Sequence, residues 1–167
     1  MAKTDEKERK KAEREIENLT IKAKSAIDKE DYSKAVSLYQ EMSRLAGSIK
    51  DKRAVDFSMD AARYSMKLGD NFKTGWSYKC AADHSFVFDD FNNAINFAMK
   101  AIKYFSKSNS MYIVQWCYNI IGRASEKIKD YGLAEKSYRK SLEIEHSEEI
   151  DKKLKNLLKR EKAKEKG

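Results

Sequence analysis

The sequence contains no proline, and this absence limits the folds that it can form. Of its 167 residues, only six are glycine. Turns between β-strands depend heavily on glycine and proline, whereas helices joined by short polar turns need neither. A long all-β or α/β chain is therefore unexpected, and the composition favours an all-α protein.

Cysteine and long apolar segments are also scarce. The two cysteines, Cys80 and Cys117, form no Cys-x-x-Cys pair, and both lie within apolar helical patterns. No apolar run approaches the roughly 18 residues of a membrane-spanning helix, and residues 1–14 are too highly charged for a secretory signal. These features predict a reduced protein of the cytoplasm.

The positive charge is concentrated at one end of the chain. The formal net charge is +8, yet residues 152–167 alone carry eight Lys/Arg against two Glu. Segments 1–15 and 16–151 each have only one more basic than acidic side chain. A nucleic-acid-binding protein usually spreads basic and aromatic side chains over a folded face, and this sequence does not show that pattern clearly.

A repeat with a spacing of 40 residues dominates what the sequence does contain. Residues 54–61 (AVDFSMDA) return as residues 94–101 (AINFAMKA), and Trp76 returns as Trp116. A weaker third copy places Ala134 in the position of Ala94. Repeats of 20–50 residues are typical of stacked arrays, in which each unit needs a neighbour to bury its apolar face. This architecture indicates binding rather than chemistry.

Helical periodicity predicts eight antiparallel helices in a right-handed α-α superhelix, without the period-two alternation of strands. The expected helices cover about 5–29, 31–47, 50–68, 72–88, 90–107, 111–128, 131–144 and 147–164. Gly47 and Gly69 mark expected helix ends. We expect one domain over residues 1–167. It comprises a charged lead-in at 1–15, a repeat body at 16–146, and a basic capping helix at 147–167 that frays beyond about residue 160.

Two segments resemble the second helix of a tetratricopeptide repeat. The pattern Asp-[Phe/Tyr]-x-x-Ala occurs at 90–102 and at 130–142, and Ile121-Gly122 fits the small-residue pair of that repeat's first helix. The longer helices, with segments 67–72, 78–82, 93–96 and 100–105, resemble the N-terminal part of the soluble NSF attachment protein (SNAP) family. That family binds a helical bundle of membrane-fusion proteins and recruits a hexameric AAA+ ATPase. The resemblance implies a non-enzymatic scaffold or adaptor that binds proteins, as in protein or vesicle transport.

No arrangement of residues predicts catalysis, a cofactor or a metal site. His84 lies on an apolar stripe beside Asp83, but adjacent helix residues point about 100° apart and cannot form a relay. We therefore interpret His84 as an interior histidine and His146 as a turn residue. Cys80 and Cys117 are expected to be small core residues. The sequence thus argues against an enzyme with a small-molecule substrate.

Two polar stripes are candidate surfaces for a protein partner. In solenoids, equivalent positions on the first helix of each repeat line one concave face. The first stripe consists of Lys79, Asp83 and Phe86, with Asn119, Arg123 and Glu126 at the equivalent places of the next copy. The second stripe is basic and could face an acidic partner: it consists of Lys100, Lys103 and Lys107, with Lys136, Arg139 and Lys140. For both stripes the alternative is a solvated outer face.

The two tryptophans and the C-terminal helix each have two interpretations. Trp76 and Trp116 could anchor a partner, but their apolar companions favour packing between successive hairpins. Lys79 and Arg123 are then expected to be solvated on the concave face. The last helix carries a narrow stripe of Ile150, Leu154, Leu157 and Leu158. It is expected to cap the last hairpin of a monomer, and the alternative is a basic amphipathic helix that contacts nucleic acid or an anionic membrane.

Overall fold

The structure is a computed structural model, and it describes residues 2–164 of the chain. Over this range the backbone forms eight helices and no strand, as the sequence predicts. The helices are α1 (Ala2–Asp28), α2 (Tyr32–Ser48), α3 (Arg53–Lys67), α4 (Asn71–Val87), α5 (Phe91–Lys107), α6 (Met111–Lys127), α7 (Tyr131–Ile144) and α8 (Glu148–Lys164). The expected all-α helical-repeat superhelix is confirmed.

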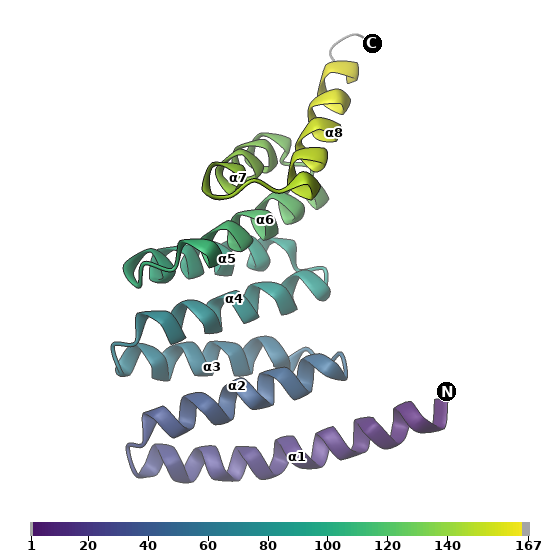
Figure 1. Cartoon of the computed structure of the whole chain (residues 1–167). Helices are drawn as coiled ribbons and strands as arrows, with labels where there is room; N and C mark the ends of the chain where they lie inside the picture. The colour runs from purple at the N-terminus through teal and green to yellow at the C-terminus, as the bar shows by residue number, and fades with distance from the viewer. Residues whose placement is uncertain (1, 165–167) are drawn as a thin grey trace.

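Each helix packs mainly against the next helix along the chain, which gives the stack seen in Figure 1. In addition, α2 contacts α4 and α4 contacts α6. Helices α2, α4 and α6 therefore lie side by side on one face of the stack, whereas α3, α5 and α7 lie on the other. Of these, α2, α4 and α6 are the first helices of successive hairpins, and the sequence predicts a binding surface on the face that such helices share.

One type of turn joins the helices at six positions in the described chain. In each turn one residue has a positive φ, between 54° and 68°, and the positions are Glu30, Lys50, Gly69, Asp89, Asn109 and Lys129. The next amide donates to the carbonyl five residues back, as from Asp90 to Ser85 at 2.9 Å. This hydrogen bond is that of the Schellman motif. Because these positions are almost evenly spaced, two helices with their turns make one copy of the sequence repeat.

An aspartate that follows the left-handed residue begins the next helix in four of these turns. Asp31, Asp70, Asp90 and Asp130 each accept a hydrogen bond from the backbone amide three residues later, at 2.9–3.2 Å. Such a side chain satisfies an amide that has no partner within the helix. A left-handed residue followed by aspartate thus ends one helix and starts the next without proline.

The role predicted for Gly47 is wrong. Helix α2 continues to Ser48, and the positive φ belongs to Lys50. Gly47 lies inside the helix, where an added Cβ would overlap the ring of His84. Its small size therefore permits the close approach of α4, whereas Gly69, with a φ of 68°, has the turn role expected of it.

Small residues at equivalent positions allow the helices to pack closely. Ala54, Ala94 and Ala134 occupy the same position in successive copies of the repeat, and all three are 0% exposed. Gly122 is also buried, and an added Cβ there would lie 2.5 Å from the ring of Tyr138. Gly122 therefore fits the small-residue position inferred from the sequence: because it has no side chain, the ring of Tyr138 on the following helix can pack against it.

Stacked tyrosines join the two helices within two successive hairpins. Tyr39 of α2 stacks on Tyr64 of α3, and Tyr78 of α4 stacks on Tyr104 of α5. The ring centroids are 5.7 Å apart in both pairs. Tyr64 and Tyr104 are 40 residues apart, which is the spacing of the sequence repeat. They therefore make the same aromatic contact in two successive hairpins.

The last junction departs from the repeated turn. Glu145 has an extended backbone with a φ of −155°, and α8 rises at a steep angle to the other helices (Figure 1). Ile150, Leu154 and Leu157 are buried in one cluster with Tyr138, as expected for a capping helix. The helix continues to Lys164 rather than fraying beyond residue 160, and residues 165–167 of the predicted tail lie outside the described chain.

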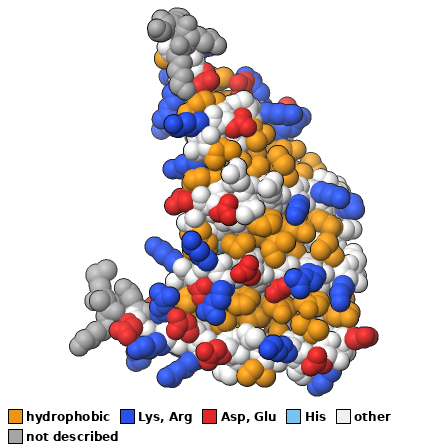
Figure 2. Space-filling model, turned by 180° about the vertical axis from the view of Figure 1, so that it is seen from behind, with side chains coloured by type: hydrophobic (Ala, Val, Ile, Leu, Met, Phe, Trp, Pro, Cys, Tyr) orange, Lys and Arg blue, Asp and Glu red, His pale blue; other side chains and the backbone are white. Residues whose placement is uncertain are grey.

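The surface combines exposed hydrophobic side chains with dispersed charges. Figure 2 shows hydrophobic side chains along the stack and Lys and Arg gathered near the α8 end at the top. None of the described helices is both long enough and apolar enough to cross a membrane.

Substitutions at the left-handed residue of two of these turns should change the free energy of unfolding in opposite directions. A residue with a Cβ in the left-handed region costs about 1 kcal/mol relative to glycine. Lys129→Gly should therefore stabilise the protein by about 0.5–1 kcal/mol, and Gly69→Ala should destabilise it by about 1 kcal/mol. Urea unfolding measures both values.

Gly132→Ala is the matched control, because Gly132 lies in α7 and an added Cβ would meet only Asp130 Oδ1, at 3.8 Å. Alanine is the better helix former, so this change should be neutral or stabilising. A stability change of the same sign for Lys129→Gly and Gly69→Ala would contradict this account of the turns.

Candidate functional site

The even-numbered helices enclose two adjacent surface hollows. The tryptophan hollow, of about 560 Å³, lies between α4, α6 and the start of α8 and is lined by Trp76, Lys79, Tyr112, Ile113, Gln115, Trp116, Asn119, Glu145, His146, Ser147, Glu149 and Ile150. The histidine hollow, of about 630 Å³, lies between α2 and α4 and is lined by Ser37, Gln40, Glu41, Ser43, Arg44, Gly47, Ser48, Ser58, Ala61, Trp76, Ser77, Cys80, Asp83 and His84. Because Trp76 lines both, we treat them as one concave groove.

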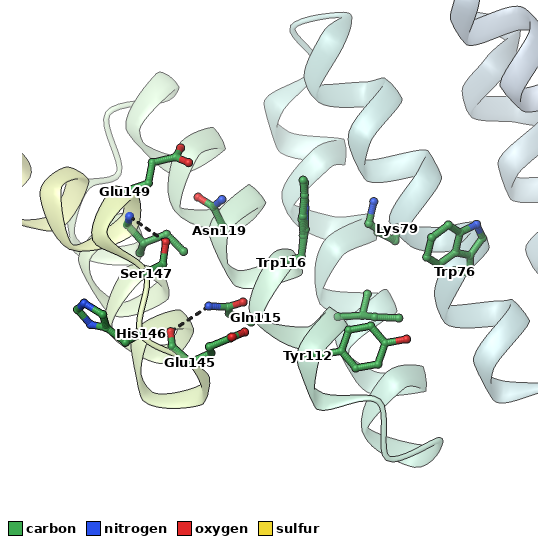
Figure 3. Close-up of a pocket in the computed structure, with 12 residues that line it drawn as sticks. Trp76, Lys79, Tyr112, Gln115, Trp116, Asn119, Glu145, His146, Ser147 and Glu149 are labelled. Carbon is green, nitrogen blue, oxygen red and sulfur yellow. Dashed lines mark hydrogen bonds between the residues drawn. The ribbon is translucent and has the colours of Figure 1, made fainter.

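Lys79 occupies the centre of this groove, between the two tryptophans. Its Nζ lies 5.4 Å from the ring centroid of Trp76 and 4.8 Å from that of Trp116. The same Nζ donates to Asp83 Oδ2, one turn later on α4, at 2.7 Å. Figure 3 shows the Lys79 side chain between the two indoles. The positive charge is therefore held by two aromatic faces and one carboxylate.

Two sequence predictions about this centre are wrong. Trp76 and Trp116 are 41% and 45% exposed rather than packed between hairpins. Ala81 and Ala82 on α4 are fully buried and fill the contact with neighbouring helices, so the indoles project into the groove instead. Lys79 is not solvated either: its side chain is only 15% exposed, because the rings and Asp83 cover it.

Two further aromatic side chains extend this exposed surface. Phe72 and Tyr112 lie one turn before the tryptophans and occupy equivalent positions of the repeat; they are 41% and 68% exposed. The Phe72 ring stacks on Trp76 with 6.5 Å between centroids. Neither residue is among the candidates predicted from the sequence, although their spacing of 40 residues is that of the repeat. Exposed aromatic side chains gathered in this way are typical of interaction surfaces.

Asn119 adds a polar group to the tryptophan hollow. Its Oδ1 is buried and has no hydrogen-bond partner in the described part of the chain. Nearby, Gln115 Nε2 donates to the carbonyl oxygen of Glu145 at 2.9 Å, which fixes the segment before α8. Most buried polar atoms are paired, so this acceptor is an exception within the described chain.

The remaining residues of the first predicted stripe lie farther along the same helices. The Arg123 guanidinium is 4.5 Å from the ring centroid of Phe86. Glu126 accepts a hydrogen bond from the Tyr138 hydroxyl at 2.6 Å. Burial and this hydrogen bond raise the pKa of Tyr138 well above its ordinary value. Glu126 is thus engaged within the protein, whereas Arg123 is exposed.

The second predicted stripe lies on other helices. Lys100 and Lys103 belong to α5 and Lys140 to α7, so the structure does not bring them to the groove. Lys100 Nζ lies 5.7 Å from the ring centroid of Phe97, and Lys140 pairs with Glu143 at 2.7 Å. These lysines therefore lie on the second helices of the hairpins, outside the groove.

His84 is half-buried rather than fully interior, and it lines the histidine hollow between α2 and α4. Its Nε2 lies 3.1 Å from Ser43 Oγ, which in turn lies 2.7 Å from Ser58 Oγ. Burial lowers the pKa of His84 from its ordinary value, although Asp83 opposes this effect. The imidazole is therefore neutral at neutral pH and joins α4 to α2 through Ser43.

The two thiols are free and weakly acidic. Burial raises the pKa of Cys80 to about 11 and that of Cys117 to about 12. Both therefore remain protonated at neutral pH. Cys117 is a buried core residue, as expected, whereas Cys80 is half-buried and lines the histidine hollow. Within the described chain, no group of three or more His, Cys, Asp or Glu residues is arranged to hold a metal ion.

Comparison with known proteins supports the repeat type. Residues 117–146, which cover most of α6 and all of α7, match the tetratricopeptide repeat family. This match confirms a tetratricopeptide-type hairpin, and the finer resemblance to the SNAP family stays a prediction. Comparison with curated protein sequences gives no match.

One of the solved structures that match this chain is similar to it in fold. The crystal structure of BtubC (BKLC) from P. vanneervenii has a TM-score of 0.65 and 15% identity, and the alignment covers 93% of this chain and 83% of that one. The DHF119 filament has a TM-score of 0.32 and 18% identity, with coverage of 96% and 95%. Because the sequence identity is so low, the first similarity concerns the fold alone.

The half-buried His84 predicts how stability depends on pH. Because the folded protein binds a proton at His84 less readily than the unfolded chain does, its stabilising contribution is complete above the ordinary histidine pKa of about 6.5. This contribution is lost as the pH falls through the lower pKa of the folded state. The urea midpoint should therefore decrease between pH 7.5 and pH 5.

The variant His84→Gln should lower stability at pH 7.5 and flatten this decrease, because the titrating group is absent. His146→Gln, which changes the exposed histidine, should retain the wild-type profile. An equal decrease in wild type and His84→Gln would show that other groups cause it.

Proposed function

We propose that this chain is a non-enzymatic scaffold or adaptor that binds a helical or extended protein segment in the concave groove. The observation that carries the proposal is the pair of half-exposed indoles, Trp76 and Trp116, on either side of Lys79. Tetratricopeptide-type repeats in general support a protein-interaction role. The chain acts as a monomer in this proposal.

The chemistry of the groove suits a protein ligand. Tryptophan and tyrosine are enriched among the residues that dominate binding energy at interfaces. The charge of Lys79 is already balanced by Asp83 at 2.7 Å, so covering the groove does not leave an unpaired cation. The contacts of Lys79 also restrict both indoles, which reduces the entropy lost on binding.

The resemblance to the SNAP family supports a helical bundle, or an assembly with an AAA+ ATPase, as the partner in intracellular transport. The free thiols Cys80 and Cys117 suit a reducing compartment such as the cytoplasm.

The alternative function, binding of nucleic acid or an anionic membrane through the last helix, has weaker support. An amphipathic helix binds a membrane through its apolar face, but Ile150, Leu154 and Leu157 are buried against the last hairpin. Two of the lysines on α8, Lys153 and Lys155, are also paired with acidic side chains one turn earlier.

Site-specific photo-cross-linking tests the proposed groove. A photoreactive residue at Tyr112, which is 68% exposed in the groove, should capture a protein from an extract of the source cell. The same residue at Met99, which is 45% exposed on α5, is the matched control and should not capture that protein.

Trp76→Ala combined with Trp116→Ala should abolish capture from position 112. Because the rings are only partly buried, each change should cost about 2 kcal/mol, below the roughly 3–5 kcal/mol of a fully buried ring. Two outcomes would instead place the interface on the second helices. One is capture of the same protein from position 99; the other is capture that is lost only when the charges of Lys100 and Lys140 are reversed.

Salt dependence separates this groove from an electrostatic interaction. Raising the salt from about 50 to 200 mM should weaken binding of the captured protein only modestly, because apolar anchors carry the affinity. A protein that neutralises several phosphates would lose orders of magnitude in affinity over this range. Loss of that size would favour the alternative function of the last helix.

A further inference from the structure

A third hollow, of about 430 Å³, lies beside the concave groove at the C-terminal halves of α4 and α6. We call it the arginine hollow; it is lined by Phe86, Arg123, Glu126, Lys127, Tyr138, Lys153 and Arg160. Four of these seven side chains are cationic and one is acidic. We propose that the arginine hollow binds the carboxylates of an acidic segment of the protein partner, an inference that rests on the proposed function.

The cations of this hollow are only partly neutralised. Lys153 pairs with Glu149 at 2.5 Å, and Arg160 lies 3.8 Å from Glu126. In contrast, Arg123 and Lys127 form no ion pair with any described residue, and both are exposed. Two positive charges therefore remain available to a ligand.

Contacts within the protein hold the hollow in shape. The Arg123 guanidinium lies over the face of Phe86 at 4.5 Å, and Phe86 packs edge-to-face on Phe91 at 5.5 Å. On the other side, the Tyr138 hydroxyl fixes Glu126 at 2.6 Å. A planar guanidinium held in this way can donate two parallel hydrogen bonds to a carboxylate.

The arginine hollow continues the surface of the concave groove. Trp116, Asn119 and Arg123 follow one another at i, i+3 and i+7, so they share one face of α6. At about 1.5 Å per residue, Trp116 and Arg123 lie roughly 10 Å apart along the helix. A short segment with an apolar residue at the indoles and carboxylates about 10 Å farther along reaches both hollows.

The charges favour an acidic protein segment over nucleic acid. Glu126 lines the hollow and Glu149 lies beside it, so the anionic groups of a ligand must be spaced to avoid these two carboxylates. Proteins that bind nucleic acid electrostatically neutralise many phosphates at once, whereas only Arg123 and Lys127 are unpaired among the described cations of this hollow. Two cations between fixed carboxylates match a few carboxylates at defined positions.

Fluorescence anisotropy with two synthetic peptides tests this proposal. The first is a fluorescein-labelled peptide with two leucines followed by four glutamates; the second carries glutamine in place of each glutamate. At about 100 mM salt the glutamate peptide should bind at least tenfold more tightly. Arg123→Gln with Lys127→Gln should abolish this difference without changing the melting temperature, because both side chains are exposed.

Lys100→Gln with Lys103→Gln is the matched control. It removes the same two charges from exposed positions on α5, and Lys100, like Arg123, lies over an aromatic ring. This control should retain the tenfold preference. An equal loss in both double variants would show that net charge, and not the arginine hollow, causes the preference.

The other outcomes also decide the question. Equal binding of the two peptides, or binding of neither, would overturn the acidic-segment proposal; the groove itself is judged separately by cross-linking from position 112. A single-stranded oligonucleotide could also bind more tightly than the glutamate peptide, with the same dependence on Arg123 and Lys127. That result would overturn the proposal and indicate that the arginine hollow binds nucleic acid.

Discussion

The whole architecture depends on one turn that recurs at almost even spacing along the chain. Each copy places a residue in the left-handed region and closes the helix end with the same backbone hydrogen bond, as at Lys129 and Asp130. The turns give successive helices similar lengths, so Ala54, Ala94 and Ala134 occupy the same place in each hairpin. A change in turn length would shift these small residues out of the contacts that admit a neighbouring helix.

The same regularity creates the groove. Because α4 and α6 are in register, Trp76 and Trp116 project from equivalent turns of adjacent helices, and Lys79 lies between them. The pattern ends at Glu145, where the extended backbone turns α8 away from the stack. This last helix then completes both the tryptophan hollow and the arginine hollow, which receive side chains from its first turn and from its later turns.

Much of the fold was predictable from the sequence, and much of the site was not. The repeat spacing and the turn at Gly69 are determined by residues that are close in the sequence, so the eight helices and their order could be predicted. Spacing places Trp76 on a helical face, but only the neighbouring helix decides whether that face is covered. The contact of Lys79 with Trp116 crosses from α4 to α6, and no local pattern specifies such a distance.

Acrylamide quenching of tryptophan fluorescence tests the central claim most directly, because Trp76 and Trp116 are the only tryptophans in the chain. Both indoles are half-exposed in the free protein, so acrylamide should quench their emission efficiently. A partner captured at the groove should protect them, once the partner's own emission, measured on the isolated partner, is subtracted. Unchanged quenching in the saturated complex would contradict the account, because the partner would then bind elsewhere.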